Sequence, residues 1–155
     1  FGTNYGMLTV ESEIIWRFGR NMETIDTSIN KNGVAFFATE MGELLWEGKP
    51  LNISVKSLYQ IPSSMDFIIL LNWNEAIERK QRNLLRFSCF GKVIWIVEKP
   101  KSDFRFIKTS IIDAIDIYTG ISRIEKGLVF AYSCLGYSDH IDIESGRIIS
   151  TEFVK

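Results

Sequence analysis

Short apolar runs separated by glycine turns recur along the chain. Strand candidates cover residues 65–73, 128–135 and 148–153 and are rich in β-branched and aromatic side chains, which favour pleated strands. The dipeptides Asn32-Gly33 and Ser145-Gly146 stand between such runs and are typical of tight turns. This pattern predicts a protein built mainly of antiparallel β-hairpins.

Weaker patterns extend this prediction. Strands are expected at residues 7–10 and 14–18, at residues 104–112 and at residues 141–143. The segment 74–82 is the one fair helix candidate, because it opens with an asparagine that can cap a helix. The expected fold is therefore all-β, with antiparallel hairpin or meander repeats that form either a partial propeller or a β-sandwich and at most one short helix. No change in composition divides the chain, so residues 1–155 are expected to form a single domain.

A repeated motif connects distant parts of the sequence. Residues 85–91 and 130–136 both contain an aromatic residue followed by Ser-Cys, a large apolar residue and glycine, and residues 36–42 are a weaker copy. The alignment predicts that Phe87 and Tyr132, together with Cys89 and Cys134, occupy equivalent core positions. The separation of 45 residues between the two close copies is typical of propeller blades and related β-repeats.

The glycine of this motif opens a second pattern. In residues 42–46 and 91–95 a glycine is followed by one charged residue, an apolar pair and a tryptophan. Residues 13–16 and 146–150 are partial copies of this pattern. An apolar strand, a tight turn with a glycine at positive φ, and a returning strand explain each copy. The tryptophans are expected to be core anchors.

Composition and charge exclude several classes of protein. A hydrophobic fraction of 46% and a net charge of −1 exclude a disordered chain and give no overall positive surplus for neutralising phosphates. The longest apolar run, residues 67–71, is far shorter than the roughly 20 residues of a membrane helix. The first residues lack a signal-peptide pattern, and both cysteines lie in apolar strands as reduced core thiols. The expectation is a cytoplasmic protein that binds neither nucleic acid directly nor a membrane.

Few residues offer catalytic chemistry. His140 is the only histidine and the chain has no Cys-x-x-Cys, which argues against zinc ligation. On a strand, His140, Asp142 and Glu144 would share one face, but apolar-in, polar-out alternation explains that pattern without a metal. Cys134 and His140 flank one expected turn, so a cleft beside them is the place where an enzyme or small-ligand site would lie. The favoured expectation is that the chain has no catalytic, cofactor-binding or metal residues.

Residues 85–95 and 131–149 carry a family resemblance. They resemble small bacterial proteins with degenerate propeller-type repeats and, more distantly, quinoprotein repeats, although the copies here are too few to close a cofactor-binding ring. Compact proteins of this kind are similar to the immunity proteins of contact-dependent growth inhibition systems. The resemblance implies a non-enzymatic protein without a cofactor, which neutralises a cognate toxin domain by direct binding. The alternative is a small-ligand-binding protein or an enzyme that uses the cleft near His140 and Cys134.

Overall fold

The computed structural model describes residues 24–100, 117–133 and 135–153. Strands account for 53% of these residues and form three antiparallel sheets, which confirms the expected all-β class. The strands expected at residues 7–10, 14–18 and 104–112 lie outside the described residues. No helix within the described ranges is long and apolar enough to cross a membrane.

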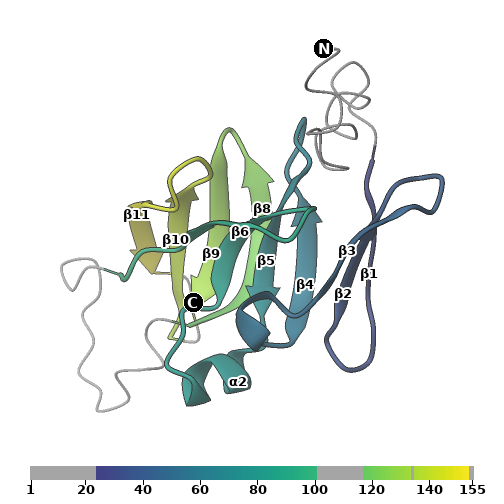
Figure 1. Ribbon diagram of the computed structural model, residues 1–155. Coiled ribbons are helices and arrows are strands. Elements are labelled where there is room, and N and C mark those ends of the chain that lie inside the picture. The colour runs from purple at the N-terminus through teal and green to yellow at the C-terminus, as the bar shows by residue number, and fades with distance from the viewer. Residues whose placement is uncertain (1–23, 101–116, 134, 154–155) are drawn as a thin grey trace, which may run out of the picture.

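Each sheet is a meander in which strands that follow one another along the chain pair side by side (Figure 1). The first sheet contains β1 (Asp26–Ile29), β2 (Ala35–Ala38) and β3 (Leu44–Gly48). The second contains β4 (Val55–Gln60), β5 (Asp66–Leu71), β6 (Leu84–Ser88) and β7 (Val93–Ile96). The third contains β8 (Tyr118–Glu125), β9 (Leu128–Ser133), β10 (Tyr137–Asp142) and β11 (Ile148–Phe153). The expected strand at 141–143 overlaps only the last two residues of β10, because residue 143 already lies in the following turn, whereas the expected strand at 148–153 coincides with β11.

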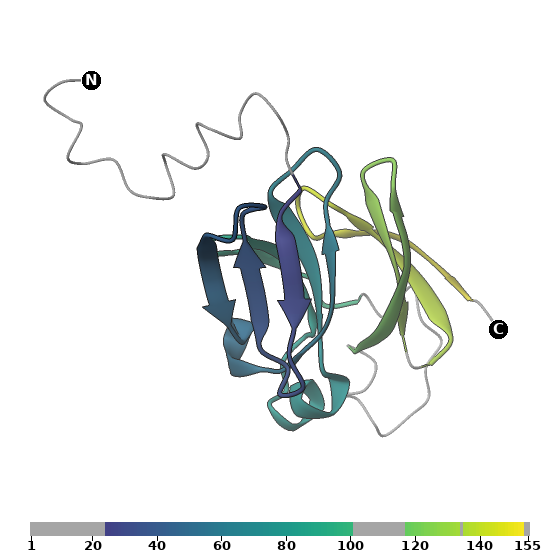
Figure 2. The ribbon, with the colours of Figure 1, turned by 90° about the vertical axis from the view of Figure 1, so that its right-hand side faces the viewer.

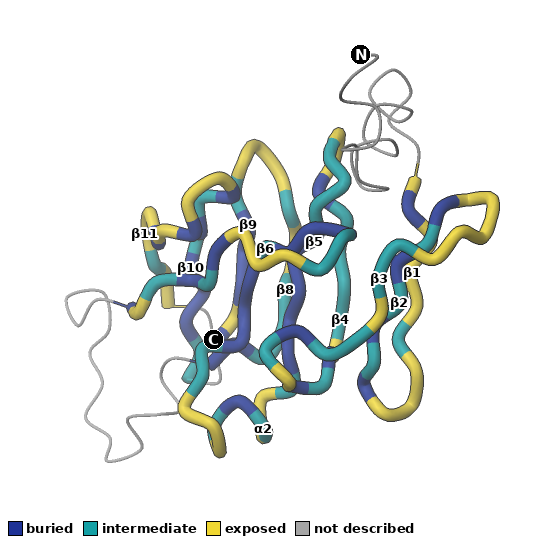
Figure 3. The backbone as a smooth tube through the Cα atoms, in the orientation of Figure 1, coloured by how far each residue is buried: buried dark blue, intermediate teal, exposed yellow. Residues whose placement is uncertain are grey.

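The three sheets are stacked as layers, with the second sheet in the middle (Figure 2). Strand β5 shows the consequence, because its side chains alternate between two cores. Phe67 and Ile69 belong to the core shared with the first sheet, and Ile68 and Leu70 to the core shared with the third. A strand buried on both faces needs a continuous apolar run rather than an alternating one, and β5 is accordingly buried along most of its length (Figure 3).

The core between the first two sheets is aromatic. The ring of Phe37 lies 4.7 Å from that of Phe67, and the ring of Trp46 lies 4.9 Å from that of Phe87. Phe37 is fully buried, and Phe87 is 2% exposed. Tilted and edge-on rings at these separations are favourable in addition to the burial of their area.

A buried asparagine connects the second and third sheets. Asn83 lies directly before β6 and is 0% exposed. Its side-chain amide donates to the carbonyls of Leu71, at 3.0 Å, and Tyr118, at 2.7 Å, and its Oδ1 accepts from the backbone N–H of Tyr118 at 2.8 Å. All the polar atoms of this side chain therefore have partners, as a buried amide requires.

The helix α2 (Trp73–Glu78) is shorter than the segment expected at 74–82. It is capped by Asn72, whose side chain accepts from the backbone N–H of Glu75 at 3.1 Å. The chain leaves the helix at Lys80, which adopts a positive φ of 53°. One turn of 3-10 helix, η2 (Pro50–Asn52), follows the first sheet.

The structure contains repeated sheets, but the predicted alignment of Phe87 with Tyr132 is wrong. Strand β6 is the third strand of its sheet and β9 only the second, so Phe87 and Tyr132 are not equivalent. Phe87 is in the core as expected, whereas Tyr132 is 39% exposed because β9 belongs to an outer layer and its alternation turns this ring away from the second sheet. Cys89 is buried, and Cys134 lies outside the described residues.

The equivalent turns are those that lead into the last strand of each sheet. They are the β2–β3, β6–β7 and β10–β11 turns, which carry Gly42, Gly91 and Gly146. All three glycines have positive φ, at 89°, 91° and 76°, a conformation that favours glycine. The turn glycine, followed after one residue by an apolar pair, therefore marks the repeat, and a tryptophan comes next in the first two sheets.

Candidate functional site

The face of the third sheet that is turned away from the second sheet has an aromatic centre, in which Phe130 is buried at 9% exposure and Tyr132 is 39% exposed. Pairing across the four strands places Arg123, Phe130, His140 and Ser150 in one row on this face. In the neighbouring row Tyr132 stands on β9, and Ser138 pairs with Glu152. We call the face formed by Arg123, Phe130, Tyr132, His140 and Glu152 the aromatic face.

Arg123 is held at the edge of the aromatic face. Its guanidinium carbon lies 3.9 Å from the centre of the Phe130 ring, within the range of a cation–π contact. Its Nε also lies 2.8 Å from a carboxylate oxygen of Glu125, and both side chains are about half exposed, at 55% and 50%. The guanidinium therefore remains accessible while its position is set from two sides.

His140 is fixed by its neighbours on two adjacent strands. Its Nδ1 lies 2.8 Å from Ser150 Oγ, and its ring centre lies 4.5 Å from that of Phe130. Its Nε2 lies 3.4 Å from Glu152 Oε1 but makes no hydrogen bond with any described residue. This second nitrogen therefore has a nearby carboxylate but unused hydrogen-bonding capacity.

His140, Asp142 and Glu144, which alternation was expected to place on one face, do not converge. Strand β10 ends at Asp142, whose Oδ2 accepts from the backbone N–H of Ser145 at 3.2 Å and from its hydroxyl at 2.5 Å. Glu144 lies in the following turn with its side chain 79% exposed, 3.6 Å from Arg86. Within the described ranges no three histidine, cysteine or acidic residues gather in a way that could hold a metal ion.

A buried carboxylate lies on the opposite face of the third sheet. Asp139 is 0% exposed and accepts from the hydroxyls of Tyr118 and Thr151, each at 2.6 Å. These donors come from β8 and β11, so Asp139 joins the first and last strands of the sheet to β10. The role this geometry supports is to stabilise the sheet that carries the aromatic face.

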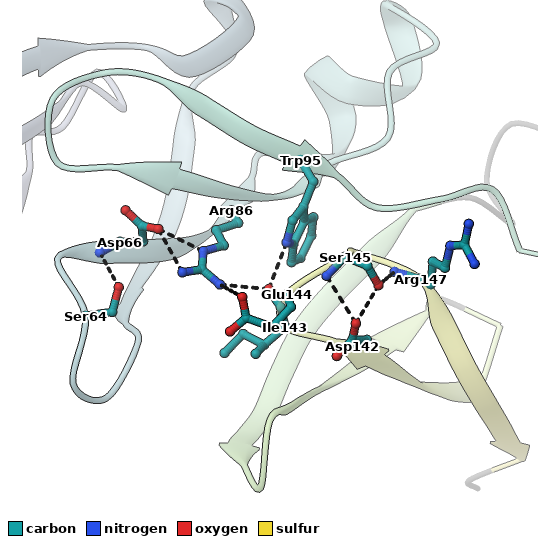
Figure 4. A network of polar contacts seen from close by, with 9 residues as sticks. All are labelled: Ser64, Asp66, Arg86, Trp95, Asp142, Ile143, Glu144, Ser145 and Arg147. Atoms are coloured by element: carbon teal, nitrogen blue, oxygen red, sulfur yellow. Dashed lines mark hydrogen bonds and ion pairs between the residues drawn. The ribbon is translucent and has the colours of Figure 1, made fainter.

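The orientation of the third sheet is set by a polar junction with the second (Figure 4). Arg86 donates to Asp66 Oδ2 at 2.9 Å and to the carbonyl of Ile143 at 3.0 Å. Trp95 donates to the same carbonyl at 2.8 Å. The Arg86 side chain is only 12% exposed, and charge-assisted bonds of this kind are among the stronger polar contacts in proteins. The β10–β11 turn is therefore attached firmly to the second sheet.

A groove runs between the first strands of the second and third sheets. It has a volume of about 290 Å³ and is lined by Tyr59, Gln60, Pro62, Ile121, Ser122, Arg123 and Ile124. This volume is at the lower limit of ordinary small-molecule pockets. His140 is not among the residues that line it, and Cys134 lies outside the described residues. The groove is therefore a different place from the cleft expected beside His140 and Cys134.

The comparison with solved structures agrees with the repeat architecture. The chain is similar to BamB from Moraxella catarrhalis, with a TM-score of 0.51 and 13% identity over 86% of this chain and 36% of that chain. The chain thus spans about a third of the length of BamB, whose β-propeller-like fold supports propeller-type β-repeats here.

Two further structures match more weakly. The computationally designed protein Ika8 has a TM-score of 0.48 at 13% identity, covering 85% of this chain and 37% of that chain. A protein of unknown function from Bacteroides caccae has a TM-score of 0.45 at 13% identity, covering 83% of this chain and 45% of that chain. No protein-family model matches the sequence, and no curated protein matches it.

Proposed function

We propose that this protein acts by binding another protein through the aromatic face. The observation that carries the proposal is the arrangement of Tyr132, 39% exposed, on the same face as the Arg123–Phe130 stack. Tyrosine and arginine are enriched among the residues that dominate binding energy at interfaces. The face also rests on a sheet whose position is set by buried hydrogen bonds, so less conformational freedom is lost on binding.

We infer further that the partner is a bacterial toxin domain and that binding neutralises it in the cytoplasm. The resemblance to immunity proteins of contact-dependent growth inhibition systems supports this assignment. The net charge of −1 fits a protein whose partner is another protein rather than nucleic acid or a membrane. In this role the protein needs no cofactor and catalyses no reaction.

The test is to co-express the chain with the toxin domain encoded immediately upstream, and to measure growth and the affinity of the purified pair. We expect protection and a complex in the nanomolar range. Tyr132→Ala and Arg123→Ala should each weaken the complex at least tenfold, as hot-spot truncations do. Trp73→Ala is the matched control, because Trp73 is 37% exposed but lies on α2, in the connection between β5 and β6 of the second sheet.

Two results would contradict the proposal. One is the absence of both protection and a complex. The other is an equal loss of affinity in the Trp73 control and the Tyr132 variant, which would move the interface away from the aromatic face. The alternative function, a ligand-binding or catalytic site near His140 and Cys134, predicts instead an activity that His140→Ala abolishes.

A further inference from the structure

The turn between β1 and β2 ends with Asn32 and Gly33. Asn32 is the only asparagine in the chain that is followed by glycine. The turn is closed by the backbone N–H of Gly33, which donates to the carbonyl of Asn30 at 3.0 Å. Gly33 adopts a φ of 79°, in the left-handed region that glycine enters readily. The backbone nitrogen that follows the Asn32 side chain therefore belongs to a residue with no side chain to shield it.

The side-chain amide of Asn32 is not held in place by other residues. Asn32 is exposed, and its side chain makes no hydrogen bond with any described residue. Asn30 differs, because its Oδ1 accepts from the backbone N–H groups of Asn32, at 2.9 Å, and Val34, at 3.0 Å. The side chains of Asn72 and Asn83 are also engaged, in the cap of α2 and in the link between the second and third sheets. The Asn32 amide is thus free to turn towards the next backbone nitrogen.

We propose that Asn32 is a site of spontaneous deamidation and isoaspartate formation, with water as the only co-reactant. The reaction begins when the turn opens and releases the Gly33 N–H from the Asn30 carbonyl, and exposed hairpin tips open locally at low cost. The Gly33 nitrogen gives up its proton and attacks Cγ of Asn32. The new N–Cγ bond closes a succinimide ring, the Cγ–Nδ2 bond breaks, and Nδ2 takes up a proton and leaves as ammonia.

Water then opens the ring in one of two ways. Addition of water at Cγ breaks the new N–Cγ bond, returns a proton to the Gly33 nitrogen and leaves an aspartate side chain. Addition at the main-chain carbonyl carbon of Asn32 breaks the original peptide bond instead and leaves isoaspartate, in which the chain continues through Cβ and Cγ. Both products carry one more negative charge than asparagine, but only isoaspartate lengthens the main chain, by a methylene group.

The lengthened main chain would fall at a close contact between the first and second sheets. The backbone of Gly33 packs directly against Ser54, because a Cβ added at this glycine would overlap Ser54 Cβ. The Gly33 carbonyl accepts from the backbone N–H of Val55, the first residue of β4, at 2.8 Å, and Ser54 Oγ donates to the Asn32 carbonyl at 3.4 Å. Isoaspartate takes that carbonyl out of the main chain and displaces Gly33. It therefore weakens the attachment of the β1–β2 hairpin to the second sheet, whereas aspartate leaves the main chain as it is.

Asn52 provides a matched comparison within the same chain. It is exposed like Asn32, and its side chain makes no hydrogen bond with a described residue. The next backbone N–H, that of Ile53, closes a turn by donating to the Pro50 carbonyl at 3.1 Å. Ile53 is fully buried, and its β-branched side chain is stiff, so it obstructs the approach of Cγ to the backbone nitrogen. The two sites thus share exposure and a closing hydrogen bond but differ in the residue that follows.

The experiment incubates the purified full chain in warm, mildly alkaline buffer and follows each asparagine by peptide mass spectrometry, with isoaspartyl methyltransferase labelling to detect isoaspartate. We expect conversion at Asn32 to both aspartate and isoaspartate, while Asn52 stays intact over the same interval. Asn32→Gln should abolish the isoaspartate signal, because glutamine would have to close a larger ring. Conversion at Asn32 that is no faster than at Asn52 would overturn the proposal. A product at Asn32 without isoaspartate would overturn it as well, since direct hydrolysis of the side chain yields aspartate alone.

Urea denaturation of the separated forms tests the effect on the junction between the sheets. The isoaspartate form should unfold at a lower urea concentration than the parent chain. Asn32→Asp, which adds the same charge without lengthening the main chain, should unfold at the parent's midpoint. Coincident midpoints for the isoaspartate form and Asn32→Asp would refute the loss of attachment at Ser54. These measurements need no partner protein, so their outcome is independent of the proposed interface.

Discussion

Truncating Phe87 to alanine should lower the free energy of unfolding by about 3–5 kcal/mol, the range for large aromatic side chains in cores. The upper half of that range is expected because Phe87 is 2% exposed and its ring lies 4.9 Å from Trp46 and 6.3 Å from Phe37. Both neighbours belong to the first sheet, so a cavity at Phe87 would loosen the contact between two layers. In a chain of this length the loss corresponds to a fall in melting temperature of about 6–20 °C.

The matched control is Tyr132→Ala, which removes an aromatic ring from the position that the sequence motif aligned with Phe87. Because Tyr132 is 39% exposed, its truncation should cost no more than about 1 kcal/mol. Urea denaturation followed by circular dichroism would measure both values, with equal m-values showing that the unfolded states are comparable. Equal costs for the two variants, or a cost below about 1 kcal/mol for Phe87, would refute the assignment of these rings to the core and to the surface.

Three further variants test the junctions between elements. Trp95→Phe should cost about 1–2 kcal/mol in thermal or urea unfolding, since one donor to the Ile143 carbonyl is lost while the other remains. Asn83→Ala should cost at least about 3 kcal/mol, because several buried backbone groups lose their partner. Hydrogen bonds from the Ser54 side chain and backbone lower the pKa of Glu75, so its stabilisation is present above the ordinary glutamate pKa and lost as the pH falls through the folded value. Glu75→Gln should therefore flatten the acid side of the stability–pH curve, and an unchanged curve would contradict this.

The glycine turns explain why much of the fold was predictable. Gly42, Gly91 and Gly146 adopt a positive φ, and each of their turns is followed by an apolar strand. The turn preference of the local sequence and the place of the turn in the fold therefore agree. Strand β5 was predictable for a different reason. Its continuous apolar run satisfies two cores at once, which leaves a clear signal in the sequence.

Strands β1, β4 and β8 escaped prediction because their local patterns are weak. Three of the four residues of β1 are exposed, so the strand carries almost no apolar signal. Strand β4 has a register shift near its start, and β8 has two such irregularities. Each shift breaks the period of two on which a sequence-based assignment of strands depends.

The aromatic face was not predicted, because the exposure of one side of a strand depends on how the sheets are layered and not on the sequence of the strand itself. Tyr132 lies in an apolar strand that resembles a core strand, and only the order of the layers shows that one side of β9 is uncovered by the second sheet. The predicted strand alternation around His140 is partly confirmed, because His140 and the buried Ile141 lie on opposite faces of β10. Its partners Ser150 and Glu152 come from the next strand, and register cannot be deduced from spacing alone.

Ser150 connects the architecture of the repeat to the proposed interface. In the first two sheets the equivalent position carries Trp46 and Trp95, each of which packs on a glycine of the next sheet. In the third sheet a small hydroxyl stands there and holds Nδ1 of His140 at 2.8 Å. An indole at this position would compete with His140 for space on the outer face. The serine thus provides a polar contact for His140 at the position where the first two sheets carry a tryptophan that packs on the next sheet.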